Sequence, residues 1–319
     1  MHIIRNFLCA LIAIVVIQAP TDARSDTWPR RTVKIIVPLP AGGGTDVAAR
    51  LFAERLAERW KQGVVVENRP GVDGLTGVTS FVSSRDDHTL LFSFAGPLSI
   101  NPLIYDKLAY DPDRDLVPIA SAIDNFFGIA VSNSMGVDSM SAFVETARNN
   151  PGKFNWAATA GLPQYIFAAL QKSAGIELTQ VPYKDFAPAL QDFAEGRIHV
   201  VVTTPSFLIP QVQAGKAKLL MVTNRQRSPL APEVPTAEES GFAALTFEGV
   251  VGFYGWRDMP VSLRDQIAAD INAVGADPAV ASRLRNSGIV VRVSTPAELA
   301  SSIEQQKAKV REIVASTKR

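Results

Sequence analysis

Apolar residues along this chain follow two patterns: short continuous runs, and longer stretches in which they recur at helical spacing. Runs of strand length begin at Val33 and recur at 64–66, 89–94, 128–131, 198–202 and 219–222. Between them, apolar residues three or four positions apart predict helices at 140–149, 165–174 and 188–195. Strands alternating with helices favour an α/β fold with parallel sheets covered on both faces.

The C-terminal part of the chain is predicted to be helical, and capping residues mark its boundaries. Thr295 is followed by Pro296 and Glu298, which combines an N-cap, a first-turn proline and a capping-box partner. Asp277 and Pro278 start a shorter helix in the same way, and Gly288 ends it. These signals are structural and carry no chemistry.

The segment 33–46, VKIIVPLPAGGGTD, predicts a strand, a tight loop and the start of a helix. The helix is indicated by apolar residues that recur every four positions, namely Ala48, Phe52, Leu56 and Trp60. Free N–H groups and the helix dipole at such an N-terminus suit an anion, either a carboxylate or a phosphate. A glycine-rich βα turn without any ligand remains the alternative.

This glycine loop fits neither of the common nucleotide motifs. A Walker loop needs a lysine followed by serine or threonine after its last glycine, whereas Gly44 is followed by Thr45 and Asp46. The three adjacent glycines also do not supply the G-x-G-x-x-G of a dinucleotide site. The loop therefore argues against nucleotide binding.

The first 23 residues have the features of a secretory signal peptide. Arg5 precedes an apolar run at 7–17, and small residues precede an expected cleavage site after Ala23, with Ala19 as the second candidate. The run is shorter than the ~20 apolar residues that span a bilayer. We therefore expect an exported, periplasmic protein.

Composition excludes several function classes. The only cysteine, Cys9, lies in the predicted signal peptide, so the exported chain should have no disulfide, thiolate metal site or cysteine nucleophile. With 32 basic and 31 acidic residues the net charge is +1, and no basic run suggests nucleic acid. No second apolar stretch has membrane-spanning length, so we expect a soluble mature protein. A length of 319 residues argues for two domains.

Six segments of the chain resemble the Bug-type, or tripartite tricarboxylate transporter, periplasmic solute receptors. They keep the order and spacing of that family and are PLPAGGGTD at 38–46, VVVENRPG at 64–71, TLLFS at 89–93, INPLIYDKLAYDPDRDLVPIA at 100–120, VPYK at 181–184 and RSPLAPEVPTAEESG at 227–241. The resemblance covers nearly the whole mature chain.

The resemblance implies a type II periplasmic binding protein with two α/β domains that close on a ligand about a hinge. One domain would combine 25–127 with 247–319, and the other would hold 128–246. The ligand would be a small carboxylate, delivered by a monomeric receptor to a membrane permease of the tripartite tricarboxylate type. No cofactor and no metal are expected.

The resemblance also implies which residues bind the ligand. They form two facing groups: Pro40, Ala41, Gly42, Gly43, Gly44, Thr45, Asp46, Ser93, Ala95 and Gly96 from the first domain, and Thr159, Ala160, Gly161, Gln164, Tyr183, Asp185, Thr203 and Thr204 from the second. The loop amides and Thr45 would hold one carboxylate, with 159–161 facing them. Hydroxyls would fix the remainder directly or through water.

Three departures from the family pattern bear on the ligand. The loop after Trp156 reads ATAGLPQ, which is two residues shorter than usual, with Gln164 near the position of a family histidine. Thr203 and Thr204 stand where many members have aspartate and asparagine. A threonine offers only a neutral hydroxyl, whereas an aspartate would pair with an ammonium. We therefore expect an amine-free carboxylate rather than an amino acid.

Two histidines remain after the signal peptide. His199 stands where an acidic residue is common in the family, and the simpler interpretation is a sheet-end residue rather than a ligand contact. His88 lies in a polar turn beside Asp86 and Asp87, so we expect it to be solvated.

Two other functions compete with transport. An exported hydrolase would need a nucleophile with a base, paired carboxylates or a metal cluster, and neither G-x-S-x-G nor H-E-x-x-H occurs. Asp46 could be proposed as a general base, but the first turn of a helix favours aspartate for its capping value alone. A receptor that reports to a sensor kinase would use the same closing clamp, and the sequence does not separate it from a transport receptor.

Overall fold

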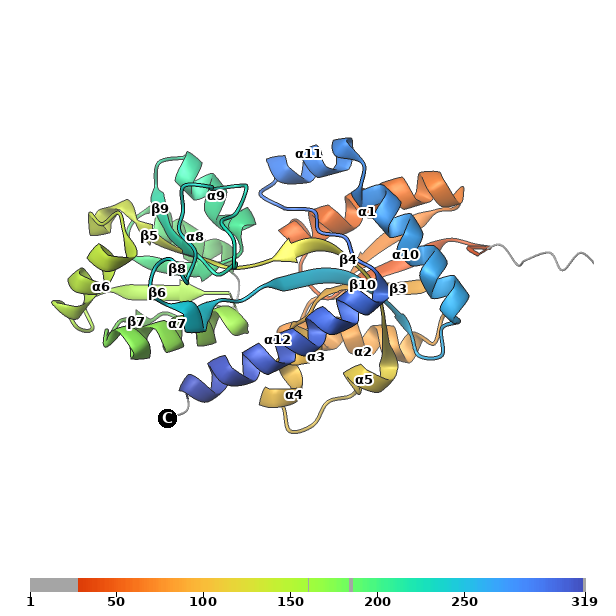
Figure 1. The fold of residues 1–319 in the computed structure, drawn as a ribbon, viewed down its shortest axis with the longest axis horizontal. Helices are drawn as coiled ribbons and strands as arrows, with labels where there is room; N and C mark the ends of the chain where they lie inside the picture. The colour runs from red at the N-terminus through yellow and green to blue at the C-terminus, as the bar shows by residue number, and fades with distance from the viewer. Residues whose placement is uncertain (1–27, 160, 184–185, 318–319) are drawn as a thin grey trace, which may run out of the picture.

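The computed structural model describes residues 28–159, 161–183 and 186–317, which form two lobes joined by crossing strands (Figure 1). The first lobe is built on a five-stranded sheet of order β2-β1-β3-β10-β4, and the second on a five-stranded sheet of order β7-β6-β8-β5-β9. The predicted signal peptide lies outside the described residues.

In the first lobe, strands β1, β2 and β3 run parallel, while β10 is antiparallel to both β3 and β4. The strands are β1 (Val33–Val37), β2 (Val64–Asn68), β3 (Thr89–Phe94), β4 (Leu116–Asn125) and β10 (Gly249–Trp256). One face is covered by α1 (Gly44–Trp60), α10 (Val261–Gly275) and α11 (Pro278–Asn286). The other is covered by α2 (Leu75–Ser84), the short α3 (Gly96–Ser99) and part of α12 (Pro296–Thr317). Two one-turn helices, α4 (Asn101–Ile104) and α5 (Pro112–Asp115), lie between α3 and β4.

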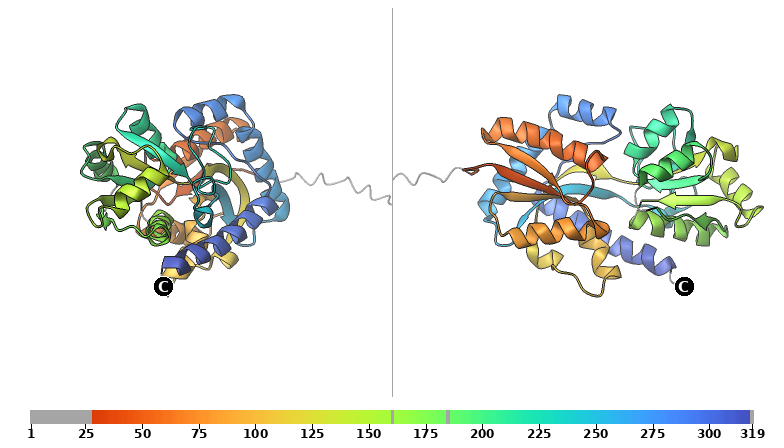
Figure 2. Two further views of the ribbon diagram at one scale, coloured as in Figure 1. Left: turned by 60° about the vertical axis from the view of Figure 1, so that its left-hand side comes forward. Right: turned by 180° about the vertical axis from the view of Figure 1, so that it is seen from behind.

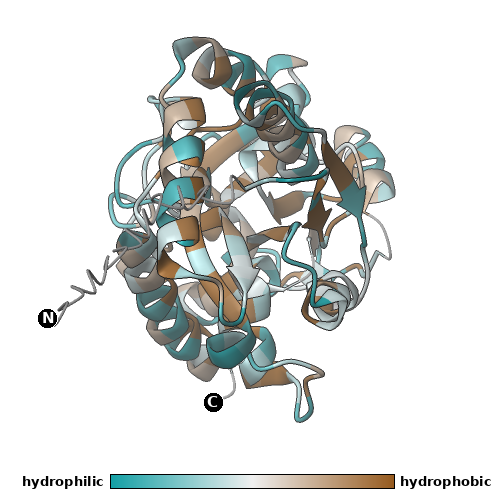
Figure 3. Cartoon of the chain, turned by 90° about the vertical axis from the view of Figure 1, so that its right-hand side faces the viewer, coloured by the Kyte–Doolittle hydropathy of each residue, from teal (hydrophilic) through white to brown (hydrophobic). Residues whose placement is uncertain are grey.

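In the second lobe, β6, β7 and β8 run parallel, and β5 is antiparallel to β8 and β9. The strands are β5 (Gly128–Ser132), β6 (Asn155–Ala158), β7 (Thr179–Gln180), β8 (Val200–Thr203) and β9 (Ala217–Val222). Helices α6 (Met140–Arg148) and α7 (Leu162–Ala174) cover one face. Helices α8 (Phe186–Ala194) and α9 (Pro205–Gln213) cover the other. Apolar residues concentrate on the strands and inward helix faces of both lobes (Figure 3).

The structure corrects the prediction of parallel sheets, because both sheets are mixed. Strands β4 and β10 carry the chain between the lobes, and β10 enters the first sheet antiparallel to its neighbours. The strand β10 was missed because Gly249, Gly252 and Gly255 interrupt its apolar run. A Cβ on Gly252 would lie 2.8 Å from the carbonyl oxygen of Ala120, so close strand packing requires that glycine.

The crossing segments meet at one buried threonine. The Thr223 hydroxyl accepts from the N–H of Phe127 at 3.0 Å, and the Thr223 N–H donates to the Phe127 carbonyl at 2.9 Å. The Phe247 N–H donates to the Thr223 carbonyl at 2.8 Å. The rings of Phe127 and Phe247 are stacked, with centroids 5.5 Å apart. These contacts tie the outgoing segment to the returning segment, close to the predicted domain limits of 127 and 247.

Helix α12 connects the two lobes on one side (Figures 1 and 2). Its N-terminus has the predicted capping box, because Glu298 Oε2 accepts from the Thr295 N–H at 2.8 Å. Leu299 and Ile303 pack in the core of the first lobe, whereas Val310, Ile313 and Val314 belong to the core of the second. The prediction that 247–319 belongs to the first domain did not foresee this. Among the described helices, none is both long enough and apolar enough to span a membrane.

Candidate functional site

The predicted ligand segments lie at the carboxyl ends of parallel strands, as is usual in α/β proteins. In the first lobe, β1 leads into α1 and β3 leads into α3. In the second lobe, β6 leads into α7 and β8 leads into α9, and the Thr159 N–H donates to the Val202 carbonyl at 3.3 Å. The two sets come together across the lobes, because an ideal Cβ on Gly44 would lie 2.9 Å from Ser206 Oγ.

The glycine loop places free amides at the start of α1. Gly43 is the N-cap in an extended conformation, and Gly42 has a φ of +85°, which favours glycine. In the described part of the chain, no group accepts from the N–H groups of Gly44, Thr45 and Asp46. A Cβ on Gly42 would meet nothing within 4 Å, and one on Gly43 only the Pro40 carbonyl at 3.9 Å. The loop therefore offers donors and open space to an anion.

Asp46 braces this loop. Its buried carboxylate accepts from the Gly42 N–H at 2.8 Å, from Arg50 Nε at 3.0 Å and from Asn68 Nδ2 at 2.9 Å. Burial by itself raises the pKa of Asp46, but the hydrogen bonds from Arg50, Gly42 and Asn68 outweigh it and lower the pKa below its usual value. Both carboxylate oxygens therefore shape the loop, which disfavours a role for Asp46 as general base or direct ligand contact.

Two threonines lie where β8 ends in the second lobe. Thr203 ends β8 and is fully buried, and its Oγ1 has no hydrogen-bond partner among the described residues. Thr204 Oγ1 lies 3.1 Å from Ser206 Oγ. Gly161 has a φ of +86° and is the N-cap of α7, with the half-buried Gln164 in the first turn. Two predicted contacts, Ala160 and Asp185, lie outside the described residues.

Two predicted side chains already have partners. The hydroxyl of Ser93 donates to the Phe94 carbonyl at 2.9 Å and is buried with Ala95 and Gly96. The hydroxyl of Tyr183 donates to Asp192 Oδ2 at 2.5 Å. Burial and the hydrogen bond to Asp192 raise the pKa of Tyr183 to about 12, so this phenol stays protonated. Neither hydroxyl can donate to a ligand without first giving up its protein acceptor.

Known proteins resemble this chain over most of its length. The profile of the tripartite tricarboxylate transporter family receptor matches residues 48–318. The chain belongs to this receptor family. A Pseudomonas protein encoded in the tcbD-tcbE intergenic region is 32% identical over 311 residues, 95% of this chain and 91% of that protein. The protein BugT of Bordetella pertussis is 32% identical over 72% of each chain.

Solved structures with the same fold include two carboxylate complexes. The R. palustris protein Rpa4515 with adipate is 27% identical, with a TM-score of 0.84 over 91% of this chain and 98% of that chain. The protein MatC of Rhodopseudomonas palustris with bound malate is 26% identical, with a TM-score of 0.78 over 90% of this chain and 100% of that chain. The predicted Bug-type family and the type II periplasmic binding protein fold are therefore confirmed, and the chain is a solute-binding receptor.

Sequence reasoning missed one segment beside the predicted ligand loops, the turn after α11. A Cβ on Gly288 would lie 3.2 Å from Ser206 Cα. An ideal Cβ on Gly44 would lie 3.6 Å from Ile289 Cδ1. This turn is more than 240 positions from the glycine loop in sequence, and no local pattern links the two. Only the fold brings them together.

The two histidines have structural roles. The prediction that His88 is solvated is wrong, because its side chain is buried. His88 Nε2 accepts from the Arg30 N–H at 3.0 Å, so Nδ1 carries the proton and donates to Asp87 Oδ1 at 2.7 Å. His199 Nδ1 accepts from the Asn155 N–H at 3.0 Å, and burial lowers the pKa of His199. His199 precedes β8 and thus lies at the opposite end of that strand from Thr203.

One group of potential metal ligands occurs among the described residues, namely Asp86, Asp87 and His88. Arg31 Nη2 donates to Asp86 Oδ1 at 2.6 Å, and the Thr89 hydroxyl donates to Asp86 Oδ2 at 2.8 Å. Arg31 also contacts Asp87. The ligand atoms of this group are thus engaged in protein contacts, which stabilise the turn before β3.

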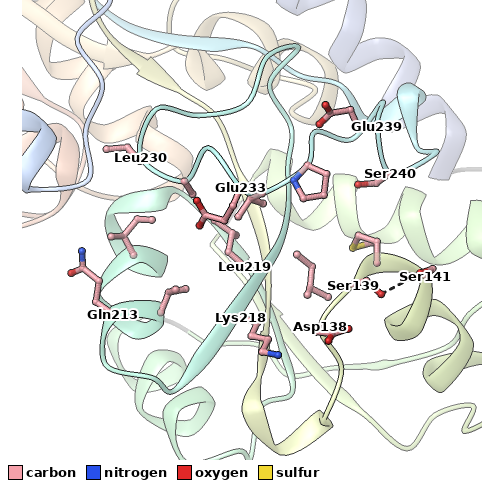
Figure 4. A pocket seen from close by; sticks show the side chains of 17 residues that line it. Asp138, Ser139, Ser141, Gln213, Lys218, Leu219, Leu230, Glu233, Glu239 and Ser240 are labelled. Carbon is pink, nitrogen blue, oxygen red and sulfur yellow. Dashed lines mark hydrogen bonds between the residues drawn. The ribbon is translucent and has the colours of Figure 1, made fainter.

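A cavity of about 680 Å³ lies on the second lobe, away from the ligand loops (Figure 4). Its walls come from α9, β9, the start of α6 and the segment 228–240, and its rim carries Asp138, Lys218 and Glu233. Glu239, also in the wall, is engaged by Arg227 and by the Thr236 N–H. The cavity includes none of the residues predicted to bind ligand.

Proposed function

We propose that this receptor captures a small, amine-free carboxylate between its lobes and delivers it to a tripartite tricarboxylate-type permease. The observation that carries the proposal is that each lobe has unsatisfied polar groups at the carboxyl ends of its strands. They are the free amides at the start of α1 and the buried hydroxyl of Thr203. The amides need an acceptor, and the hydroxyl can donate or accept a hydrogen bond; the described residues provide neither partner.

The first lobe supplies the anion site. Three consecutive N–H groups at Gly44, Thr45 and Asp46 lie at the positive end of a 17-residue helix. Hydrogen bonds from neutral donors to a carboxylate are stronger than neutral pairs, because the acceptor is charged. A carboxylate group at this point would satisfy the amides without needing a lysine or arginine.

The second lobe supplies selectivity. A buried hydroxyl without a partner costs about 1–3 kcal/mol, which a ligand oxygen or a bridging water would recover. Thr203 carries no charge, so it gives no compensation to a desolvated ammonium. The arrangement favours diacids or aromatic acids over amino acids. Two relatives of the family, solved with adipate and with malate, hold acids without an amine.

Export of the receptor and delivery of its ligand to a membrane partner are roles that the family suggests. The predicted signal peptide would place the receptor in the periplasm, and a closed, ligand-bound form would be the state that the membrane partner recognises. The family is one of solute-binding receptors, and the engaged Asp46 gives no free base for catalysis.

A thermal-shift screen of the purified receptor tests this function. The panel contains mono-, di- and tricarboxylates, aromatic acids and amino acids, because a ligand that binds only the folded state raises Tm. We expect shifts with amine-free acids alone. A shift with amino acids would remove the selectivity argument, and no shift with any acid would contradict the carboxylate assignment.

A further inference from the structure

The two lobes touch beside the ligand loops at a contact made by three small residues, which we call the clasp: Gly44, Ser206 and Gly288. An ideal Cβ on Gly44 would lie 2.9 Å from Ser206 Oγ and 3.1 Å from Ser206 Cβ. Both contacts are shorter than side chains normally make, so a side chain at position 44 would have to displace Ser206. The backbone of Gly44 is helical and does not itself require glycine. The closeness of the opposite lobe, and not the local backbone, therefore explains the glycine at position 44.

Gly288 approaches the same serine from another direction. A Cβ there would lie 3.2 Å from Ser206 Cα and 3.5 Å from the Pro205 carbonyl. Ser206 thus sits between two glycines of the first lobe, in the first turn of α9, and its Oγ lies 3.1 Å from Thr204 Oγ1. Figure 1 shows α9 of the second lobe facing α1 and α11 of the first.

The opposite side of the molecule is held in a different way. There α12 packs Val310, Ile313 and Val314 into the core of the second lobe, and each of these side chains is buried. Separating apolar surfaces of this kind is costly, at roughly 25 cal/mol per Å². The clasp packs one half-buried serine against two glycines and can separate at much lower cost.

We propose that the receptor opens at the clasp while α12 keeps the lobes together, and that Gly44 is a positioning residue that sets how far the lobes close. The role of the clasp in capture rests on the proposed function, but the contact itself does not. Closure brings the amides of α1 towards the second lobe, so a side chain at position 44 would stop closure before a ligand is enclosed.

A cysteine pair tests the contact without any ligand. In a chain carrying Cys9→Ser, the variants Gly44→Cys and Ser206→Cys supply the only two thiols. The separation of 3.1 Å between their Cβ positions is slightly below the ~3.5–4.5 Å of a disulfide, so small adjustments allow the bond. We expect mild oxidation to remove both free thiols, with or without carboxylate.

The control pair is Gly63→Cys with Ser206→Cys, also on the Cys9→Ser background. Gly63 precedes β2 and borders the start of β1, at the end of the first sheet away from the loop. This pair should form no disulfide within one molecule, so both of its thiols should stay free. Persistence of both thiols in the Gly44 and Ser206 pair, with the carboxylate panel absent and present, would overturn the proposal.

A compensating pair of substitutions tests the positioning role. Gly44→Ala should weaken carboxylate binding on the order of tenfold, because the closed state is less populated. Adding Ser206→Gly removes both close atoms and leaves Ile289 Cδ1 at an ordinary 3.6 Å. The double variant should bind within about twofold of Ser206→Gly alone. Failure of this rescue, with normal melting of both variants, would mean that position 44 acts on the ligand and not on the lobes.

Acid binding by the wild-type receptor and cross-linking of the cysteine pair together separate this proposal from the proposed function. If no acid binds the wild-type receptor, the proposed function fails while the cysteine pair still reports on the clasp. If acids bind but the pair does not cross-link, the function stands and the clasp is wrong.

Discussion

The glycine loop of the first lobe and the facing end of β8 in the second lobe differ in how their polar groups are satisfied. The loop is held by Asp46, which contacts Gly42, Arg50 and Asn68, so that its geometry exists before a ligand arrives. At the other wall, the Thr203 hydroxyl is buried without a partner among the described residues. We infer that the first wall is preorganised and that the second is completed by what binds.

This difference assigns separate roles to the two walls. A preorganised set of amides can bind any carboxylate, since every carboxylate presents the same two acceptor oxygens. A lone buried hydroxyl distinguishes among the remaining parts of a ligand, because an unmatched polar group there is costly. Affinity should therefore depend mainly on the first wall, and selectivity on the second.

The largest effect on binding is expected from Gly43→Val. The position lies against open space, so the side chain fits the protein but occupies the approach to the α1 amides. We expect affinity for the bound acid to fall on the order of 100-fold, or about 2.7 kcal/mol. Tm should change little, because valine at this N-cap costs only about 1 kcal/mol. Calorimetric titration and thermal melting measure the two effects, and wild-type affinity in this variant would contradict the loop assignment.

Asp46→Ala should damage the first wall itself. The change removes the acceptor of the Gly42 N–H and one of the two acceptors of Asn68 Nδ2, which also donates to the Leu39 carbonyl. We expect a cost of about 1–3 kcal/mol of unfolding free energy. Binding should weaken by about tenfold, because the amides lose their fixed geometry. Chemical denaturation and titration report both losses. A variant that is destabilised yet binds normally would show that preorganisation does not matter here.

Thr203→Val should show the opposite combination. The isosteric change removes a hydroxyl that has no described partner, so the ligand-free receptor should keep or slightly gain stability. Affinity should fall about five- to tenfold through the loss of one hydrogen bond to the ligand.

Thr223→Val is the matched control for Thr203→Val. Thr223 is equally buried, but its hydroxyl accepts from the Phe127 N–H. We expect this control to lower the unfolding free energy by about 1–3 kcal/mol. If both valine variants destabilise the receptor equally, the Thr203 hydroxyl already has a partner and the selectivity argument fails.

The smallest effect concerns pH. The folded pKa of Asp46 is lowered, so its stabilising contribution is present above the unfolded pKa of about 3.9. It disappears as the pH falls through the lower folded value. The Asp46→Asn variant lacks this titration. The difference in Tm between wild type and Asp46→Asn should therefore shrink as the pH is lowered from 5 to 3. A constant difference would mean that the Asp46 charge does not contribute.

Local signals in the sequence were sufficient for several elements. The strand, loop and helix at 33–46 and the capping box at Thr295 are observed as predicted. The helix start and the capping box have signals within a few residues, and the strand has a continuous apolar run. Strand β10 was not predicted, because its glycines interrupt the apolar run. Gly252 is explained by its close contact with Ala120, which is distant in sequence. His88 was placed in solvent because its neighbours are charged, whereas Trp28 and Arg30 contact it from far along the chain.

The candidate site divides in the same way. The free amides of α1 follow from the glycine loop alone, and the hydroxyls of the second lobe were named from the family resemblance. The brace on Asp46 was not foreseen, because Asn68 lies 22 positions away. Ser206 lies two positions after the predicted Thr204, but its contact with Gly44 and Gly288 depends on how the two lobes meet.

The most direct test of the selectivity claim is a calorimetric titration of the wild-type receptor with acids that differ by one amine. Two suitable pairs are succinate with aspartate, and adipate with 2-aminoadipate. We predict that the amine-free member of at least one pair binds on the order of tenfold or more tightly than its amino counterpart. An amino acid that binds as tightly as its amine-free counterpart, or more tightly, would contradict the account of Thr203.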